Sequence, residues 1–394
     1  MNMLESCPCC GGRALNAFFK AQGVPVNSCL SLQTRAEAIA FPVGDIVLKH
    51  CRACGFVFNA AFDERLLEYS ERYDPTQAFS ETFNRWHRAL AERLVEQYDL
   101  KGRKIIEIGC GKGEFLAMLC TLGSNHGIGF DPAFASARSP TVGNGGDARF
   151  VADFYSEKYR EHVGDFVCCK MTLEHISPAL DFVTTVRRAL DGSDDPVVFF
   201  QVPDVRRILE EQAFWDIYYE HCSYFSAGSL ARVFGRAGFE VTALAREYGE
   251  QYLMIESRVV PLDERKTLPE EDDLMLIGEL VERFQSALPQ CFQAWRDRLA
   301  GFRAEGKRTV IWGAGSKGVS FLTTLGITTE IEYAVDINPH RAGLYMAKTG
   351  QEIVGPDFLR EYRPDVVIVM NPVYRPEIEQ QLRELDLRPL VLTT

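Results

Sequence analysis

The stretch "IIEIGCGKGEF", residues 105–115, decides how the middle of this sequence folds. An apolar run that carries one acid, Glu107, breaks into a turn with glycine at every second position. The glycines are Gly109, Gly111 and Gly113. This pattern predicts a buried strand that enters a glycine turn and opens a helix, because glycine lets the backbone approach a ligand closely.

Strand-like and helix-like pieces alternate around this turn, over residues 76–260. Such alternation predicts a doubly wound parallel sheet, which binds its ligand at the carboxyl ends of the strands. The next strand, "HGIGFDP", ends in Asp131, an acid placed to bind ribose hydroxyls. The glycine spacing is not the G-x-G-x-x-G of pyrophosphate binders. It resembles the E/D-x-G-x-G-x-G motif of the class I S-adenosylmethionine methyltransferases.

This first resemblance implies S-adenosylmethionine as the cofactor. Glu107 would then hydrogen-bond around the amino acid end of the cofactor, directly or through water, and Asp131 would hold its ribose. The resemblance also places Asp153, in "FVADFY", on the adenine amino group, with Phe154 beside the ring. An alternative is that these acids only cap turns.

Length and composition limit the classes of function. The chain has 394 residues, a formal net charge of −12, 46% hydrophobic and 25% charged residues, so it is long enough for two or three ordinary domains. The acidic balance argues against a protein whose main task is binding nucleic acid. No apolar segment approaches membrane-spanning length, and the start lacks a secretory signal pattern, so we expect a soluble, cytoplasmic protein.

Two cysteine pairs mark residues 1–75 as a predicted zinc-binding domain. "CPCCGG" and "CRACGF" each place two thiols three positions apart before a glycine. Four thiolates from two such turns form a closed tetrahedral site, which is typical of structural zinc. The predicted ligands are Cys7, Cys10, Cys51 and Cys54. Cys9 and Cys29 are substitutes or bystanders, and the alternative is four unrelated reduced thiols.

Residues 261–306 predict a polar, helical connector with a break at Pro289. Residues 307–394 alternate again and predict a second α/β sheet. This sheet starts with "VIWGAGSKGVSF", a true G-x-G-x-x-G turn that taken alone suggests NAD. A helix amino terminus attracts any pyrophosphate, however, and Ser316 and Lys317 offer hydroxyl, amide and ammonium contacts to phosphates. Asn338 and Asn371 are weaker candidate contacts.

A second cluster, "WDIYYEHCSYFS" at residues 215–226, suggests the acceptor site. Its aromatic rings suit a sugar or base face, and its acid and histidine can accept protons. The candidates are Tyr218, Glu220, His221 and Tyr224, joined by His175 of "KMTLEHI" after an earlier strand. The alternative is an aromatic segment that packs into a core, with a histidine that is merely packed or solvated.

Taken together, these motifs resemble the zinc-containing sugar C-methyltransferases, which act on nucleotide-linked deoxysugars and commonly methylate C-3 of a 4-keto sugar. The resemblance rests on the paired C-x-x-C knuckles, the G-x-G-x-G turn, "YYEHCSYFS", "WGAGSKG" and "DINPHRAGLYM". It implies an α/β protein with an N-terminal zinc-binding domain, a central class I (Rossmann-like) methyltransferase sheet and a second, Rossmann-like α/β domain at the C-terminus. That last domain would hold the TDP, GDP or CDP portion of the substrate.

The same resemblance implies an enolate mechanism. His221 would be the base, with Glu220 orienting it and Tyr218 nearby. His175 and Tyr73 match further active-site positions, and Phe79 and Ser80 match a segment that closes over the cofactor. The sequence departs from the family at Ala347 and Lys348, where proline and glycine are usual, and in "NPVYRPEI".

Three rival functions stay open at this stage. The base could deprotonate an alcohol, giving methyl transfer to oxygen or nitrogen of a nucleotide sugar. The C-terminal turn could serve an NAD-linked oxidoreductase or epimerase, although the first turn argues against it. A zinc-bearing scaffold or nucleic-acid-binding module is disfavoured by the acidic charge. The sequence leaves the oligomeric state open, a monomer included.

Overall fold

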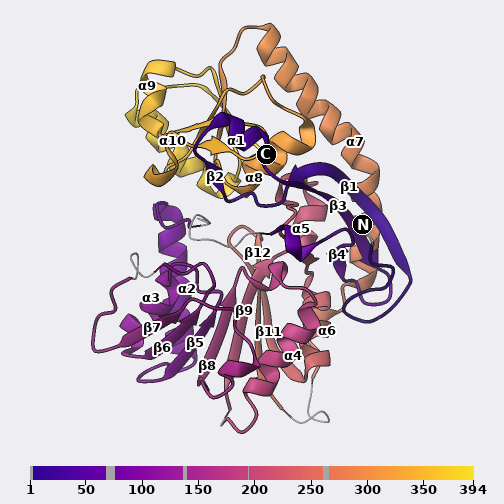
Figure 1. Ribbon diagram of the computed structural model, residues 1–394, viewed down its shortest axis with the longest axis vertical. Coiled ribbons are helices and arrows are strands. Elements are labelled where there is room, and N and C mark those ends of the chain that lie inside the picture. The colour runs from indigo at the N-terminus through magenta and orange to yellow at the C-terminus, as the bar shows by residue number, and fades with distance from the viewer. Residues whose placement is uncertain (1–2, 68–75, 136–139, 194, 261–265) are drawn as a thin grey trace.

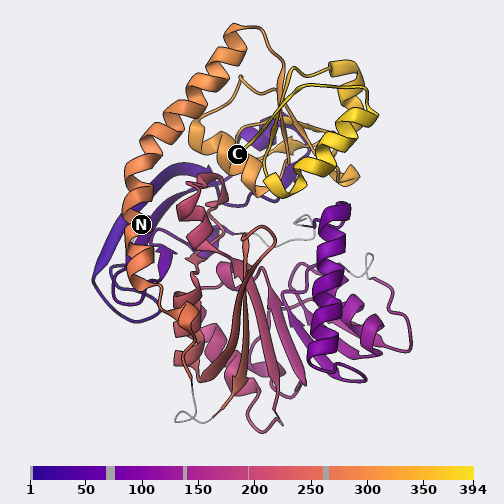
Figure 2. The same ribbon diagram turned by 180° about the vertical axis from the view of Figure 1, so that it is seen from behind.

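The computed structural model describes residues 3–67, 76–135, 140–193, 195–260 and 266–394. Three β-sheets organise these residues. Figure 1 shows the large central sheet at the bottom and the C-terminal sheet at the top, with the N-terminal segment between them on one side. Figure 2, seen from behind, shows the long helix α7 rising along that same side.

The central sheet has seven strands in the order β11-β12-β9-β8-β5-β6-β7. Strands β5 to β9 are parallel, whereas β12 is antiparallel to β9 and to β11. The strand order reverses beside β5, so the carboxyl ends of β5 and β8 form the switch point where doubly wound sheets bind ligands. The strands are β5 (Lys104–Ile108), β6 (His126–Phe130), β7 (Asp147–Val151), β8 (Phe166–Lys170), β9 (Val197–Pro203), β11 (Phe239–Glu247) and β12 (Tyr252–Val259).

Helices cover both faces of this sheet, because its central strands are apolar on both sides. Ile105 and Phe166 pack in one cluster with residues of α2 and α3, whereas Ile106 and Val167 pack in another with residues of α4 and α6. The helical segments are α2 (Glu81–Gln97), α3 (Glu114–Gly123), η3 (Glu157–Tyr159), η4 (Leu173–His175), α4 (Ala179–Ala189), α5 (Val205–Glu210), η5 (Phe214–Asp216) and α6 (Ala227–Ala237).

The C-terminal sheet is also seven-stranded, in the order β18-β17-β13-β14-β16-β15-β2. Its strands are β13 (Thr309–Trp312), β14 (Tyr333–Val335), β15 (Tyr345–Met346), β16 (Glu352–Val354), β17 (Val366–Val369), β18 (Leu390–Thr393) and, from the N-terminal segment, β2 (Ser31–Leu32). Its helical segments are α8 (Ser316–Leu325), η8 (Pro339–Arg341), η9 (Pro356–Phe358), α9 (Leu359–Tyr362), η10 (Pro372–Tyr374) and α10 (Arg375–Glu384). The predicted second α/β sheet is therefore present.

The N-terminal segment pairs with both other parts of the molecule. Its own sheet, β1-β3-β4-β10, takes β10 from the central part of the chain, and β2 joins the C-terminal sheet through β15. The elements are β1 (Leu15–Pro25), α1 (Arg35–Ile39), β3 (Val43–Cys51), β4 (Val57–Asn59), η1 (Glu64–Leu66) and β10 (Ser223–Tyr224). Division of the chain at residues 75, 260 and 306 stays a prediction.

Helix α7 (Leu274–Ala304), preceded by η7 (Pro269–Glu271), connects the central and C-terminal parts. The predicted break at Pro289 is wrong, because the helix continues through it. Proline removes one backbone donor, but buried Leu288 and Trp295 anchor the helix on both sides of that turn. The Phe284 ring packs at 5.9 Å from Phe18 of β1, so α7 also supports the N-terminal sheet.

The helices of the described residues contain no stretch that is both long enough and apolar enough to cross a membrane.

Candidate active site

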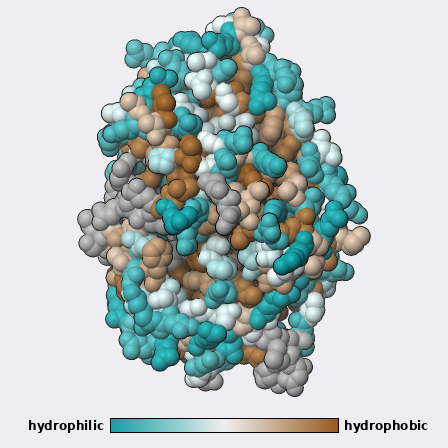
Figure 3. Space-filling view, turned by 45° about the vertical axis from the view of Figure 1, so that its right-hand side comes forward, coloured by the Kyte–Doolittle hydropathy of each residue, from teal (hydrophilic) through white to brown (hydrophobic). Residues whose placement is uncertain are grey.

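A cavity of about 880 Å³ lies where the carboxyl ends of the central strands face the C-terminal sheet. Its wall includes Glu107 and His221 from the central part, Ser316 and Asn371 from the C-terminal part, and Cys29 from the N-terminal segment. Figure 3 shows hydrophobic residues across the middle of one face of the molecule and hydrophilic residues along its upper and lower margins. All three parts of the chain thus contribute to one site.

We call the part of the cavity at the strand ends of the central sheet the predicted cofactor half, and Glu107 lines it. It is buried at the end of β5, and its Oε2 accepts a hydrogen bond from the Leu116 N–H at 3.0 Å. Burial raises the pKa of Glu107 to about 8. Gly109 follows with φ +70°, and any side chain there would collide with Thr172. The turn therefore needs glycine at this position for both conformation and space.

Asp131 is fixed by the turn that it faces. Its Oδ2 accepts from the Gly111 N–H and its Oδ1 from the Ala133 N–H, both at 2.8 Å. Burial raises its pKa, while these two hydrogen bonds lower it. The carboxylate is held at the cavity wall, where a ligand's diol can reach it.

Asp153 and Phe154 line the far end of the same half. Asp153 accepts from the Tyr159 hydroxyl at 2.6 Å and pairs with Lys158. The Phe154 side chain is 61% exposed, so a planar ligand could cover it. This position is compatible with the predicted contact to adenine, which stays a prediction.

The segment before α2 closes this half on the side of the C-terminal sheet. Ser80 caps α2, accepting from the Phe83 N–H at 3.2 Å, and its hydroxyl donates to Glu377 of α10 at 2.8 Å. The Phe79 ring lies 6.0 Å from that of His340. Both predicted residues line the cavity, whereas the predicted Tyr73 lies outside the described residues.

Two histidines meet at the centre of the cavity. The ring centroids of His175 and His221 are 4.7 Å apart, with an interplanar angle of 89°. Burial lowers the pKa of His175 to about 4. Burial, with contributions from His175 and Lys317, holds the pKa of His221 well below its usual value. Both imidazoles are therefore neutral near pH 7 and able to accept a proton.

Two buried acids accompany these imidazoles. Ser28 of the N-terminal segment donates to Glu220 Oε1 through its N–H, at 3.0 Å, and through its hydroxyl. Among the described residues, Glu220 Oε2 and both carboxylate oxygens of Glu174 find no hydrogen-bond partner. Burial raises the pKa of Glu174 to about 8 and also raises that of Glu220. Sequence reasoning assigned no role to Ser28 or Glu174.

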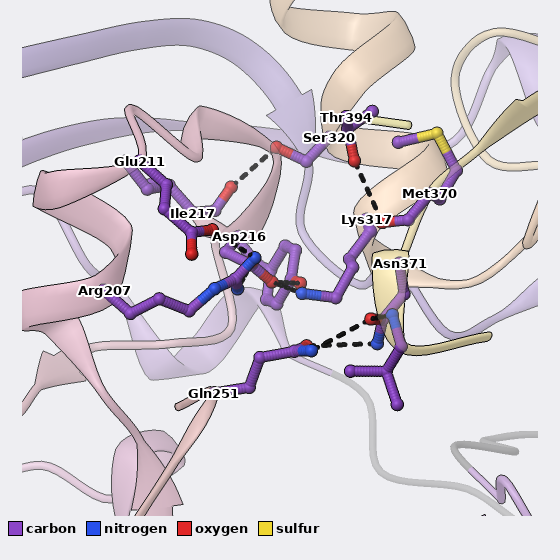
Figure 4. Close-up of polar contacts among 12 residues, drawn as sticks. Arg207, Glu211, Asp216, Ile217, Gln251, Lys317, Ser320, Met370, Asn371 and Thr394 are labelled. Carbon is purple, nitrogen blue, oxygen red and sulfur yellow. Dashed lines mark hydrogen bonds and ion pairs between the residues drawn. The ribbon is translucent and has the colours of Figure 1, made fainter. Parts of the chain in front are cut away.

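Asp216, in the predicted acceptor segment (residues 215–226), pairs with Lys317 of the C-terminal part (Figure 4). It accepts from the Tyr218 hydroxyl and from Arg207, both at 2.8 Å, and pairs with Lys317. Burial alone would raise the pKa of Asp216, but Lys317 and Arg207 bring it below its usual value. Tyr224 holds the backbone N–H and C=O of Tyr218 through its hydroxyl, at 3.1 and 3.0 Å.

The second glycine turn faces this network from α8. Ser316 Oγ lies 3.0 Å from Cys29 Sγ, and the Ala314 N–H donates to Asp336 at 3.2 Å. The Asn338 side chain caps η8 by accepting from the His340 N–H at 3.0 Å.

Asn371 exchanges two hydrogen bonds with Gln251 of the loop before β12, at 2.9 and 3.0 Å, as Figure 4 shows. This amide pair links the C-terminal part to the central part across the cavity wall. Most of the predicted site residues that the structure describes line the cavity. The exceptions are Gly113, Glu220, Tyr224 and the four cysteine ligands.

The four predicted zinc ligands form one cluster away from the cavity. Cys7 Sγ lies 3.6 Å from Cys54 Sγ, and Cys10 Sγ lies 3.6 Å from Cys51 Sγ. Four sulfurs at about 2.3 Å from a tetrahedral Zn²⁺ lie about 3.8 Å apart, so the spacing fits zinc. Cys9 and Cys29 are not members of the cluster.

Comparisons with known proteins agree with this architecture. Residues 78–244 match the model of a methyltransferase domain, and residues 264–388 match that of a C-methyltransferase C-terminal domain. The chain is 25% identical over 310 residues to the C-methyltransferase NovU of Streptomyces niveus, covering 75% of this chain and 73% of that protein.

Two solved structures were also found. The magnesium protoporphyrin IX methyltransferase of Synechocystis PCC 6803, with bound SAH, is 13% identical and covers 45% of this chain and 84% of its own, with a TM-score of 0.35. The Burkholderia thailandensis 1,6-didemethyltoxoflavin-N1-methyltransferase is 14% identical, covering 44% of this chain and 79% of its own, with a TM-score of 0.34.

Proposed function

This chain is an S-adenosylmethionine-dependent methyltransferase with a C-methyltransferase C-terminal domain, and from that premise we propose that it methylates a carbon atom of a nucleotide-diphosphate-linked keto sugar. One observation carries the proposal. A single cavity joins the cofactor-type strand ends, two neutral histidines and the amino terminus of α8. This shared cavity supports the proposal, in which methyl donor, base and a phosphate-binding turn act on one extended substrate.

His221 is the base in this proposal. Its neutral imidazole takes the proton from the carbon beside the ketone, and the electrons of the broken C–H bond form an enolate. When bound, S-adenosylmethionine would supply an electrophilic methyl group to that carbon, and the broken S–CH₃ bond would leave S-adenosylhomocysteine. His221 holds the proton after transfer, and its low pKa favours release of this proton before the next turnover.

Neighbouring side chains orient the base and balance charge. Glu220 accepts a hydrogen bond from the Ser28 N–H and lies next to His221 in the chain, and in this proposal it orients the imidazole. The Tyr218 ring packs 4.7 Å from the His221 ring, and its hydroxyl is a donor that could turn from Asp216 toward the developing enolate oxygen. The His175 ring also contacts that of His221, with centroids 4.7 Å apart.

The C-terminal part holds the diphosphate in this proposal. The backbone N–H groups at the start of α8 and the Ser316 hydroxyl face the cavity, and Lys317 adds a positive charge. Lys317 now pairs with Asp216, which also binds Arg207, so phosphate oxygens would compete for a cation that is already in place. The experiment below compares TDP, GDP and CDP as the nucleotide portion of the substrate.

The cysteine cluster holds structural zinc in this proposal. A closed set of four thiolates leaves no open position for water or substrate. The ion would brace the two turns that flank β1 and β3, and the N-terminal segment in turn supplies Ser28 to Glu220.

The experiment uses TDP-, GDP- and CDP-linked 4-keto-6-deoxy sugars. In D2O with S-adenosylhomocysteine, the protein should exchange the hydrogen beside the ketone, and with S-adenosylmethionine it should form a new C–CH₃ group seen by mass spectrometry and NMR. His221→Ala should lose both. Methyl transfer to oxygen or nitrogen, without deuterium exchange above that of a protein-free control, would contradict the proposal.

A further inference from the structure

We propose that Lys170 binds the carboxylate of the cofactor's methionine portion, so that Glu107 and Lys170 recognise opposite charges of one amino acid. The inference concerns cofactor binding and stands apart from the identity of the acceptor. It assigns a ligand to a half-buried cation that neither the glycine motif nor the proposed methyl transfer uses.

The strands place the two side chains together. Glu107 of β5 is paired with Cys168 of β8, and Lys170 is two residues farther along β8. Side chains two positions apart on a strand share a face, so Lys170 lies diagonally across from Glu107 on the side of α2 and α3. Both side chains line the cavity, and Glu107 acts on the Lys170 charge through space.

The surroundings of Lys170 provide no counter-charge in direct contact. Its ammonium donates to His87 Nε2 of α2 at 2.5 Å and lies 3.6 Å from the centre of the Phe115 ring. Burial lowers the pKa of His87 to about 2, so this imidazole is neutral and accepts. Within the described ranges of the chain, Lys170 forms no ion pair. An ammonium at the cavity wall that is held by a neutral acceptor and a ring face still has donors for an anion.

The chemistry of the cofactor matches this arrangement. Its amino acid end carries an ammonium and a carboxylate on one carbon, a few ångströms apart. A carboxylate at Glu107 attracts the ammonium, and a cation beside Glu107 attracts the carboxylate. Burial lowers the pKa of Lys170 to about 8, and an incoming anion would stabilise its charged form.

The competing explanation is that Lys170 only offsets the charge of Glu107. The two explanations differ in which ligand atoms they affect. A carboxylate contact matters for S-adenosylhomocysteine but not for 5′-methylthioadenosine, which keeps the adenosine and sulfur and lacks the amino acid. A purely structural lysine would affect the two ligands alike.

The first arm of the test uses the wild-type protein. Isothermal titration should show S-adenosylhomocysteine binding about 10- to 100-fold more tightly than its decarboxylated analogue. Equal affinities would overturn the proposal, and no acceptor sugar is needed. Failure of this binding test is therefore distinct from failure of the proposed sugar chemistry.

The second arm compares Lys170→Met with Lys101→Met, which alters an exposed lysine outside the cavity. Lys170→Met should weaken S-adenosylhomocysteine about 10- to 100-fold, change 5′-methylthioadenosine by less than about twofold and abolish discrimination against the decarboxylated analogue. Lys101→Met should match the wild type. Equal weakening of both ligands, or weakening of neither, would overturn the proposal, and unfolding temperatures verify that the variants are folded.

Discussion

The glycine turn after β5 and the one after β13 lead a parallel strand into a helix, and each ties a backbone N–H to an acid at the end of the next strand. Gly111 donates to Asp131 at 2.8 Å, and Ala314 donates to Asp336 at 3.2 Å. The charged side chains around the turns differ. Buried Glu107 and half-buried Lys170 lie beside the first turn, whereas Lys317, paired with Asp216, lies on the second.

A shared backbone turn therefore does not by itself determine which ligand binds. At the first turn, one acid and one base side by side suit a ligand that carries both charges. At the second, a lysine and a helix amino terminus that has no side-chain cap among the described residues suit a phosphate. The two proposals therefore assign the donor to one turn and the acceptor's diphosphate to the other.

The largest effect on turnover is predicted for substitution of the proposed base, His221. His221→Ala should lower turnover about 100- to 10,000-fold, because it removes the imidazole that is proposed to take the proton. Affinity for S-adenosylhomocysteine should stay within about twofold, since neither turn is changed. Steady-state kinetics and calorimetry measure both quantities.

The matched control is His126→Ala, which alters an exposed histidine on β6 far from the histidine pair. It should leave turnover unchanged. If the His221→Ala variant is correctly folded by circular dichroism and turns over at the wild-type rate, His221 is not the base.

A pair of glycine substitutions tests directly whether the two turns bind different ligands. Gly109→Ala would place a methyl group against Thr172 in a left-handed backbone conformation, so affinity for S-adenosylhomocysteine should fall at least about 100-fold. Gly318→Ala would press against the Gly313 carbonyl and should weaken nucleotide diphosphate binding instead. Calorimetry with each ligand on each variant gives four affinities. If both variants lose affinity for the same ligand, the assignment of different ligands to the two turns is wrong.

Lys317→Met should raise KM for the nucleotide sugar about 10- to 100-fold, because it removes a charged donor to phosphate. Arg207 and Tyr218 remain on Asp216, so the buried acid keeps partners. Affinity for S-adenosylhomocysteine should not change. An unchanged KM together with weakened cofactor binding would reverse the assignment of the second turn.

The smallest effect on either ligand is expected from the cysteine cluster. Cys51→Ser should release about one zinc ion per chain and lower the unfolding temperature by several degrees, because metal binding and folding of this segment are coupled. Cofactor affinity should be retained at low temperature. Metal analysis and thermal unfolding test this, with Cys291→Ser, outside the cluster, as the control. Native protein without metal would refute it.

Much of this architecture could be predicted because local patterns carry it. The run "IIEIGCGKGEF" specifies strand, turn and helix within a few residues, and Asp131 falls at the end of the next strand. The paired C-x-x-C turns likewise bring four sulfurs together. These features depend on short spacings and on the apolar strands that place them.

Contacts between distant segments could not be predicted in the same way. The two-residue strand β2 joins β15 across the molecule, and Ser28 reaches Glu220, without any periodic pattern to signal either contact. The Gln251–Asn371 pair forms only when two separate parts of the chain meet. Lys170 did leave a signal, a lysine ending the apolar strand "FVCCK", but its neighbours His87 and Glu107 come from other elements.

The most direct test is a crystal structure of the protein with S-adenosylhomocysteine and a nucleotide diphosphate added together. We expect S-adenosylhomocysteine to lie along Glu107 and Asp131, and the diphosphate to bind at Ser316 and Lys317. A nucleotide diphosphate lying across residues 109–131, or S-adenosylhomocysteine on the turn that opens α8, would contradict it.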